Sequence, residues 1–201
     1  AWIDGALEHH FIDIVMRYIQ IQKPDIVIFE DYNKGVLKVN VIEKVLGHCK
    51  TVGVPTAIDP KAKNFFAYQG ATIFKPNLKE VKEALNLDSI DTSADSMNLV
   101  HEMLQTQLNH QYSFITLSEK GVFVAGDQES HTFPAHLRNI VDVSGAGDTV
   151  IAVAALTYAA TKDIALMASA SNIAGGLVCE QSGVVPITFE QLQQEYKRIY
   201  N

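Results

Sequence analysis

Apolar residues along the chain follow two spacings, one typical of helices and one typical of buried strands. In residues 6–21 they recur three and four positions apart, as at Leu7, Phe11 and Val15, which predicts an amphipathic helix. The run Pro24–Phe29 is short, continuous and rich in β-branched residues, as in a strand buried on both faces. The same alternation continues to the end of the chain. Further strands are expected at 55–59, 71–74, 113–117, 121–125 and 129–133, and further helices at about 37–50, 78–86, 93–109, 150–160, 163–180 and 189–199.

This order of elements predicts an α/β fold. Strands that alternate with helices form a mostly parallel sheet with helices on both faces, which is a three-layer α/β/α sandwich. The last two strands, joined by Gly126-Asp127-Gln128, predict a hairpin added to one side. The chain opens directly into a helix, with neither an initiator methionine nor a preceding strand. We therefore interpret residues 1–201 as part of a single domain that lacks its first strands.

Composition and charge narrow the class of protein. The 201 residues, 47% hydrophobic and 19% charged, suit one globular domain and argue against a disordered chain. The net charge is −7 and the basic residues are scattered, so neither nucleic acid nor an anionic membrane is an expected partner. Cys49 and Cys179 both lie in apolar helical patterns and are expected to be buried thiols. With no recognisable signal peptide or membrane-spanning run, these features predict a cytoplasmic protein.

Polar clusters follow the predicted strands. In parallel sheets of this kind, ligands bind at the carboxyl ends of the strands, which meet at one edge. The sequence therefore predicts a single site rather than separate ones. The clusters are Glu30–Lys34, Asp59–Lys63, Lys75–Glu80, Ser118–Gly121 and Asp142–Asp148.

The segment Asp142–Thr149 is the strongest candidate for chemistry. The apolar pair Ile140–Val141 predicts a strand-like approach to it, and a helical run from Val150 leaves it. Gly145–Gly147 carries too little side chain to keep a ligand away, and N–H groups at a helix N-terminus favour an anion. Beside such an anion site, Asp148 is either a carboxylate that interacts with the helix dipole or a residue that performs chemistry. The residues alone leave both interpretations open.

Two interpretations are also open for Lys75–Glu80. Asn77 is well placed to cap a helix, and Glu80 stands where a capping box has its acid. Alternatively, both side chains help to hold a metal-bound nucleotide phosphate through water, since Mg²⁺ keeps most of its waters. Lys34 and Lys61 also follow strands, and each is either a solvated lysine or a point charge for a phosphate.

These residues resemble the motifs of the ribokinase-like carbohydrate kinases, and the resemblance covers essentially the whole chain. Asp142–Asp148 is similar to the C-terminal signature of the family, Asn77–Glu80 to its Asn-x-x-Glu motif, and Thr116–Gly121 to its nucleotide-side loop. Within the family, three further stretches are similar to the heptose 7-phosphate kinases of ADP-heptose synthesis: Glu30–Gly35, Ile58–Lys61 and Tyr68–Thr72.

The resemblance implies ATP-dependent phosphoryl transfer to a hydroxyl of a sugar phosphate, with heptose 7-phosphate converted to the 1,7-bisphosphate as the expected reaction. Asp148 would be the general base on the acceptor hydroxyl. The amides of Gly145, Ala146 and Gly147 would form the anion hole for the transferring group. The chain would then be the C-terminal two-thirds of one kinase domain, without its N-terminal strands and lid.

The resemblance also implies the ligand contacts. ATP and Mg²⁺ would be held by a set of polar residues and one glycine, with Asn77 and Glu80 acting on Mg²⁺ through water. The set comprises Asn77, Glu80, Thr116, Ser118, Gly121 and Asn172. The sugar phosphate would contact Asp31, Lys34 and Lys61. Asp142 and Ser144 resemble positions that bind a monovalent cation such as K⁺ in some relatives.

Some features depart from the family pattern. Asn33 replaces a usual glycine, and Lys75 stands where heptose kinases commonly have a small residue. The nucleotidyltransferase domain that is fused to some heptose kinases is absent from the chain. Two alternatives therefore stay open: another sugar or nucleoside kinase of the same fold, such as a fructokinase or phosphofructokinase-like enzyme, or a nucleotide-binding fragment without catalytic activity. A homodimer is the expected assembly of the full-length protein.

Overall fold

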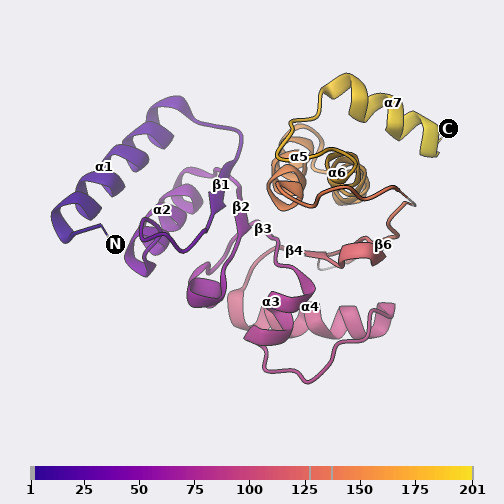
Figure 1. The fold of residues 1–201 in the computed structure, drawn as a ribbon. Helices are drawn as coiled ribbons and strands as arrows, with labels where there is room; N and C mark the ends of the chain where they lie inside the picture. Colours follow the sequence, from indigo (N-terminus) through magenta and orange to yellow (C-terminus); the bar gives the residue numbers. More distant parts are fainter. Residues whose placement is uncertain (1–2, 127, 137, 201) are drawn as a thin grey trace.

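The computed structural model describes residues 3–126, 128–136 and 138–200. Within them, a six-stranded sheet in the order β1-β2-β3-β4-β5-β6 lies between two layers of helices (Figure 1). Strands β1 (Val27–Glu30), β2 (Thr56–Asp59), β3 (Ile73–Phe74) and β4 (Tyr112–Thr116) are parallel. Strands β5 (Val122–Ala125) and β6 (Ser130–Phe133) add an antiparallel hairpin. The predicted sandwich with its hairpin is confirmed; Asp127 of the predicted turn lies outside the described residues.

The helices divide between the two faces of the sheet (Figure 1). One face carries α1 (Gly5–Gln22), α2 (Val39–Val52), α3 (Leu78–Ala84) and α4 (Ala94–Leu108), and the other carries α5 (Ala146–Thr161) and α6 (Ile164–Cys179). The last helix, α7 (Phe189–Tyr200), packs against α6. Two short 3₁₀ segments, η1 (Ala62–Ala67) and η2 (Ser118–Lys120), follow the ends of β2 and β4. In the described part of the chain, no helix is both long enough and apolar enough to cross a bilayer.

Strands β2 and β3 are buried on both faces of the sheet. In β1, the first strand in the order, Phe29 is buried but Ile28 is 38% exposed, so the predicted burial of this strand on both faces is wrong. Successive side chains of a strand point to opposite faces. Ile58 and Phe74 therefore pack with the α1–α4 layer, while their neighbours Ala57 and Ile73 pack with α5 and α6. All four are fully buried. This packing fixes the carboxyl ends of the strands along one edge of the sheet.

The segment before α5 differs from the prediction. Ile140 and Val141 lie in no strand and are 60% and 62% exposed. The backbone N–H of Val141 instead donates to Cys179 O at 2.8 Å, so the segment runs across the end of α6 rather than beside a strand. Helix α5 begins at Ala146, four residues before the predicted start, which places Asp148 within its first turn.

The prediction for the cysteines is half correct. Cys49 is fully buried in α2, and Cys179 at the end of α6 is only partly buried because the chain leaves the core there. Both thiols are free.

Candidate active site

Three carboxylates meet where the carboxyl ends of β1 and β2 face the start of α5. Oxygen atoms of Glu30, Asp59 and Asp148 all lie within 4.8 Å of one another. Glu30 and Asp59 are direct partners in the parallel ladder, whereas Asp148 comes from α5. Burial raises the pKa of Glu30, and the neighbouring carboxylates of Asp148 and Asp59 raise it further. The parallel sheet thus concentrates negative charge beside the residue predicted to be the base.

Two lysines partly balance this charge. The side chain of Lys75 is 4% exposed, and its Nζ lies 3.3 Å from Asp59 Oδ1. Lys61 Nζ lies 3.4 Å from the same oxygen and 3.0 Å from Glu80 Oε1. A buried lysine without a carboxylate partner would carry a large desolvation cost, so Lys75 depends on Asp59.

The N-terminus of α5 leaves backbone donors open toward the site. Gly145 caps the helix with φ 77°, a conformation that favours glycine, and its carbonyl accepts the first helical hydrogen bond from Thr149 N at 2.9 Å. Ala146 N donates to Val143 O at 3.2 Å. The N–H groups of Gly147 and Asp148 have no intrahelical acceptor, as is usual for a first helical turn. They are the donors that an anion at this helix end would meet.

The loop before α5 is held by Asp142. Its Oδ1 accepts hydrogen bonds from Ser144 N at 2.9 Å and Ser144 Oγ at 2.8 Å, and its Oδ2 accepts one from Gly183 N at 3.0 Å. These hydrogen bonds lower the pKa of Asp142, and the largest contribution comes from Ser144 N, followed by Ser144 Oγ and Gly183 N. Asp142 and Ser144 therefore fix the approach to the helix, and their predicted role at a monovalent cation stays a prediction.

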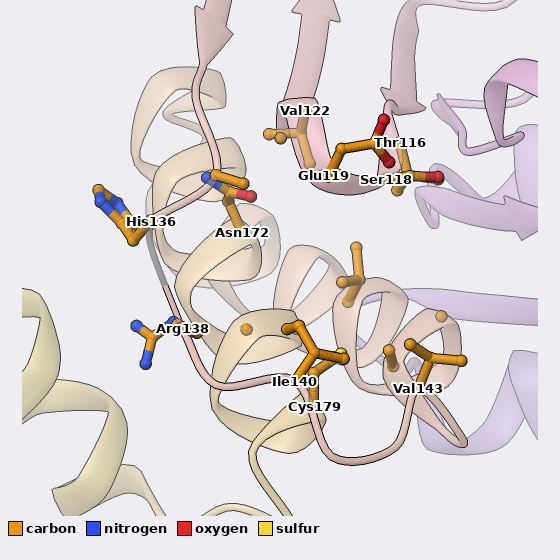
Figure 2. Close-up of a pocket in the computed structure, with 17 residues that line it drawn as sticks. Thr116, Ser118, Glu119, Val122, His136, Arg138, Ile140, Val143, Asn172 and Cys179 are labelled. Carbon is orange, nitrogen blue, oxygen red and sulfur yellow. The ribbon is translucent and has the colours of Figure 1, made fainter.

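A cavity of about 640 Å³ lies beside this helix end, between the end of β4, η2, the start of α5 and α6 (Figure 2). Figure 2 shows Thr116 and Ser118 across the hollow from Ile140 and Val143. The lining includes six of the residues predicted to bind ATP or the transferring phosphoryl group: Thr116, Ser118, Gly121, Ala146, Gly147 and Asn172.

Two of the lining residues are fixed by backbone contacts. Asn172 Nδ2 donates to Pro134 O at 2.9 Å, which ties α6 to the segment after β6. Gly121 has φ 101°, and a Cβ built on it would lie 1.9 Å from Phe133 O. Glycine is therefore required at this position for the fold itself.

Asn77 and Glu80 form the predicted capping box at the start of α3. Asn77 Oδ1 accepts from Glu80 N at 2.8 Å, and Glu80 Oε2 accepts from Asn77 N at 2.9 Å. Asn77 also forms a β-bridge with Thr116, which places it at the end of β4. Neither residue is among those that line the cavity. The capping interpretation is confirmed, and the contact with Mg²⁺ through water stays a prediction.

The three residues predicted to contact the sugar phosphate occupy different environments. Asp31 is buried and accepts hydrogen bonds from Tyr68 Oη at 3.0 Å, Asn64 Nδ2 at 3.1 Å and Asn33 N at 2.7 Å. These bonds hold the loop after β1 in place. Lys34 is exposed, and within the described residues its side chain makes no hydrogen bond or ion pair. Lys61 is shared between Asp59 and Glu80, as given above.

The backbone conformation of Asn33 is one that suits the glycine usual at this position. Its φ is 52°, in the left-handed region where glycine is free of strain and asparagine is better tolerated than most residues. Asparagine in place of the usual glycine is therefore compatible with the conformation of this loop.

Sequence reasoning missed two side chains at this site. Tyr32 Oη donates to Asp148 Oδ1 at 2.7 Å, across 116 positions of sequence. Glu30 lies in the carboxylate group although it was singled out only as the start of a polar cluster. The end of a predicted strand was a usable signal for Glu30. No local pattern pointed to Tyr32, because its partner is set by the tertiary fold.

Comparisons with known proteins identify the family of the chain. The sequence model described as pfkB family carbohydrate kinase matches residues 16–190. The chain belongs to this family. The bifunctional protein HldE of Campylobacter curvus is 36% identical over 172 residues, which cover 84% of this chain and 36% of that protein. The chain spans about a third of the length of the curated relatives it matches.

Two solved structures share the fold at low sequence identity. The phosphofructokinase-2 of Escherichia coli in complex with potassium has a TM-score of 0.86 at 14% identity, and the match covers 100% of this chain and 64% of that one. The Arabidopsis thaliana ribokinase complexed with ribose and ATP has a TM-score of 0.75 at 16% identity, covering 98% of this chain and 60% of that one. The ribokinase-like architecture expected from the sequence is therefore confirmed.

Proposed function

We propose that the protein transfers the γ-phosphoryl group of ATP to a hydroxyl of a sugar phosphate, and that heptose 7-phosphate, converted to the 1,7-bisphosphate, is its substrate. The observation that carries this proposal is the position of Asp148. It lies in the first turn of α5, beside open N–H groups and next to a cavity of about 640 Å³. Cavities of about 300–1,000 Å³ are typical of small-molecule sites, and a nucleotide belongs to this class of ligand.

The roles of the residues follow from phosphoryl-transfer chemistry, which depends on positioning and charge stabilisation more than on covalent steps. The carboxylate of Asp148 accepts the proton of the acceptor hydroxyl as that oxygen attacks the γ-phosphorus, and the bond from the γ-phosphorus to the bridging oxygen breaks to release ADP. The open N–H groups of Gly147 and Asp148 face the charge on the transferring group, whereas the N–H of Ala146, which the sequence also placed in the anion hole, is already bonded to Val143 O. Thr116, Ser118, Gly121 and Asn172 line the cavity that would receive the rest of ATP.

The donor atoms at this edge of the sheet suit Mg²⁺, a hard cation that prefers oxygen ligands and keeps several waters. Glu80 and Asn77 would hold it through water, because Glu80 is already bonded to Lys61 and to the capping N–H. When bound, Mg²⁺ neutralises phosphate charge and orients the phosphates. Asp142 and Ser144 would serve K⁺; the potassium complex of the structurally similar phosphofructokinase-2 supports this part of the proposal.

The choice of a heptose phosphate is supported by the HldE relatives and by Lys34. HldE proteins align over most of this chain at 32–37% identity. Lys34 is exposed on the loop that leads into the carboxylate group, and a lysine without an ion-pair partner among the described residues is free to meet a second phosphate. A cytoplasmic location is part of the same proposal, since ATP is a cytoplasmic substrate and the free thiols suit a reducing compartment.

A substrate panel tests the proposal. The protein as its gene encodes it is incubated with Mg–ATP and heptose 7-phosphate, fructose 6-phosphate, fructose or adenosine, and ADP and the phosphorylated product are measured. We expect the highest kcat/KM with heptose 7-phosphate. With Asp148→Asn, the phosphorylated product should form at no more than about 1% of the wild-type rate. Higher kcat/KM with another acceptor would replace the substrate but keep the kinase. ATP binding without transfer to any acceptor would favour a nucleotide-binding protein instead.

A further inference from the structure

We propose that Tyr32 is a positioning residue that holds the carboxylate of Asp148 in the orientation needed to accept a proton. The inference rests on the proposed function, because it takes Asp148 as the base. It starts from the hydrogen bond that Tyr32 Oη donates to Asp148 Oδ1 at 2.7 Å. This bond joins the loop after β1 to the first turn of α5.

Such a partner helps Asp148 because two neighbouring carboxylates repel it. Its side chain is only partly buried, and carboxylate oxygens of Glu30 and Asp59 lie within 4.8 Å. Like charges at that separation favour rotation of the exposed carboxylate toward solvent. A hydroxyl donor on one oxygen opposes this rotation and leaves the second oxygen, Oδ2, for the proton of the acceptor hydroxyl.

Tyr32 is held well enough to perform this role. The residue before it, Asp31, is buried and accepts from Tyr68 and Asn64, and the residue after it, Asn33, donates its N–H to Asp31. The backbone N–H of Asp31 also donates to Asp59 O at 3.1 Å, which continues the ladder of β1 and β2 to the base of the loop. The aromatic ring therefore extends from a fixed backbone although it is itself 54% exposed.

Tyr32 also keeps its proton under working conditions. The hydrogen bond to Asp148, followed by partial burial, raises the pKa of Tyr32 to about 12. At neutral pH the phenol is a donor and Asp148 is the acceptor. The proton of the phenol does not enter the reaction, since Asp148 Oδ2 takes the one that leaves the sugar.

Tyr32→Phe tests the inference because it removes one oxygen atom and keeps the ring. We expect kcat to fall at least about tenfold, which is near the lower end of the effect of one hydrogen bond to a charged group. The KM values for ATP and sugar phosphate should stay within about twofold, since the ring and the ligand contacts remain. The melting temperature should not change, because the lost contact is exposed. Tyr18→Phe on α1, where the side chain is 62% exposed, is the matched control and should leave kcat unchanged.

The same substitution in the Asp148→Asn background shows whether the effect passes through the base. If Tyr32 acts by orienting Asp148, the double variant is no slower than Asp148→Asn alone. A further tenfold loss in the double variant would overturn the inference, as would normal kcat in Tyr32→Phe while Asp148→Asn is inactive. Normal kcat in Asp148→Asn would instead contradict the proposed base, and the role of Tyr32 would fall with it.

Discussion

Replacing Gly147 with alanine distinguishes a glycine that a ligand requires from one that the fold requires. Gly147 is the second residue of α5, its φ is not positive, and a Cβ built on it meets no atom within 4 Å. The protein itself therefore has room for a side chain here. Gly145 differs, because its φ of 77° favours glycine whatever the ligand.

The structure gives opposite signs for stability and activity. Alanine in place of glycine stabilises a helix interior by about 0.5–1 kcal/mol, and we take about 0.5 kcal/mol for the first turn. For a chain of this size, that raises the melting temperature by about 1–2 °C. The added methyl group occupies the space from which a phosphoryl group would reach the open N–H. Because a displacement of about 1 Å can cost about a hundredfold in rate, we expect kcat to fall at least about tenfold.

Thermal melting and steady-state kinetics on the same preparation measure both effects. Gly47→Ala is the matched control: Gly47 is exposed in the middle of α2, and a Cβ there also meets nothing within 4 Å. It should raise the melting temperature and leave kcat unchanged. Normal kcat in Gly147→Ala would refute the close approach of a phosphoryl group. A lowered melting temperature would refute the structural argument that the fold does not need this glycine.

Two further predictions concern Lys34 and Glu195. Lys34→Ala should raise KM for the sugar phosphate and leave KM for ATP nearly unchanged, because this exposed lysine lies on the loop after β1 and outside the cavity lining; the reverse pattern would contradict its assignment. Glu195 accepts from Arg198 and from the nearly buried Arg138, and these bonds lower the pKa of Glu195 to about 2. A carboxyl group with a lowered pKa stabilises the fold above the ordinary value near 4.5, and this stability is lost as the pH falls toward 2. At pH 7, Glu195→Gln should therefore have a lower melting temperature than the wild type, with a free energy of unfolding about 1–2 kcal/mol smaller. This difference in free energy should shrink at pH 3. An equal difference at both pH values would show that the charge is not responsible.

The fold could be predicted from the sequence because its signals are local. The short β-branched and apolar runs at β1 and β2 predict strands, and Asn77 with Glu80 predicts a helix start; the structure confirms all three elements. Burial on both faces holds for β2 but not for β1, where Ile28 is 38% exposed. The prediction for Ile140–Val141 was wrong because it relied on the same local signal, a run of apolar residues. Two apolar residues predict burial, but here the backbone bonds to the end of α6 leave both side chains exposed.

Only the parts of the site that lie within one continuous segment could be predicted from the sequence. Asp148 and the glycines before α5 form one continuous motif, so their proximity was visible in the sequence. The contact of Tyr32 with Asp148 spans 116 positions. The hydrogen bonds that Tyr68 and Asn64 donate to Asp31 depend on how η1 and the residue after it pack against the loop that follows β1. Such pairings follow from the way α5 and η1 pack against the end of β1, which no local pattern specifies.

The most direct test of the central claim is the turnover of Asp148→Asn in the protein as its gene encodes it. The amide keeps the shape of the side chain and can still meet Tyr32, but it cannot accept the proton of the acceptor hydroxyl. We expect kcat to fall at least about a hundredfold. The affinity for Mg–ATP should stay the same or rise, because a negative charge near the phosphates is removed. Near-normal kcat combined with a lowered melting temperature would contradict the account, since it would leave Asp148 only the role of a carboxylate that stabilises the start of α5.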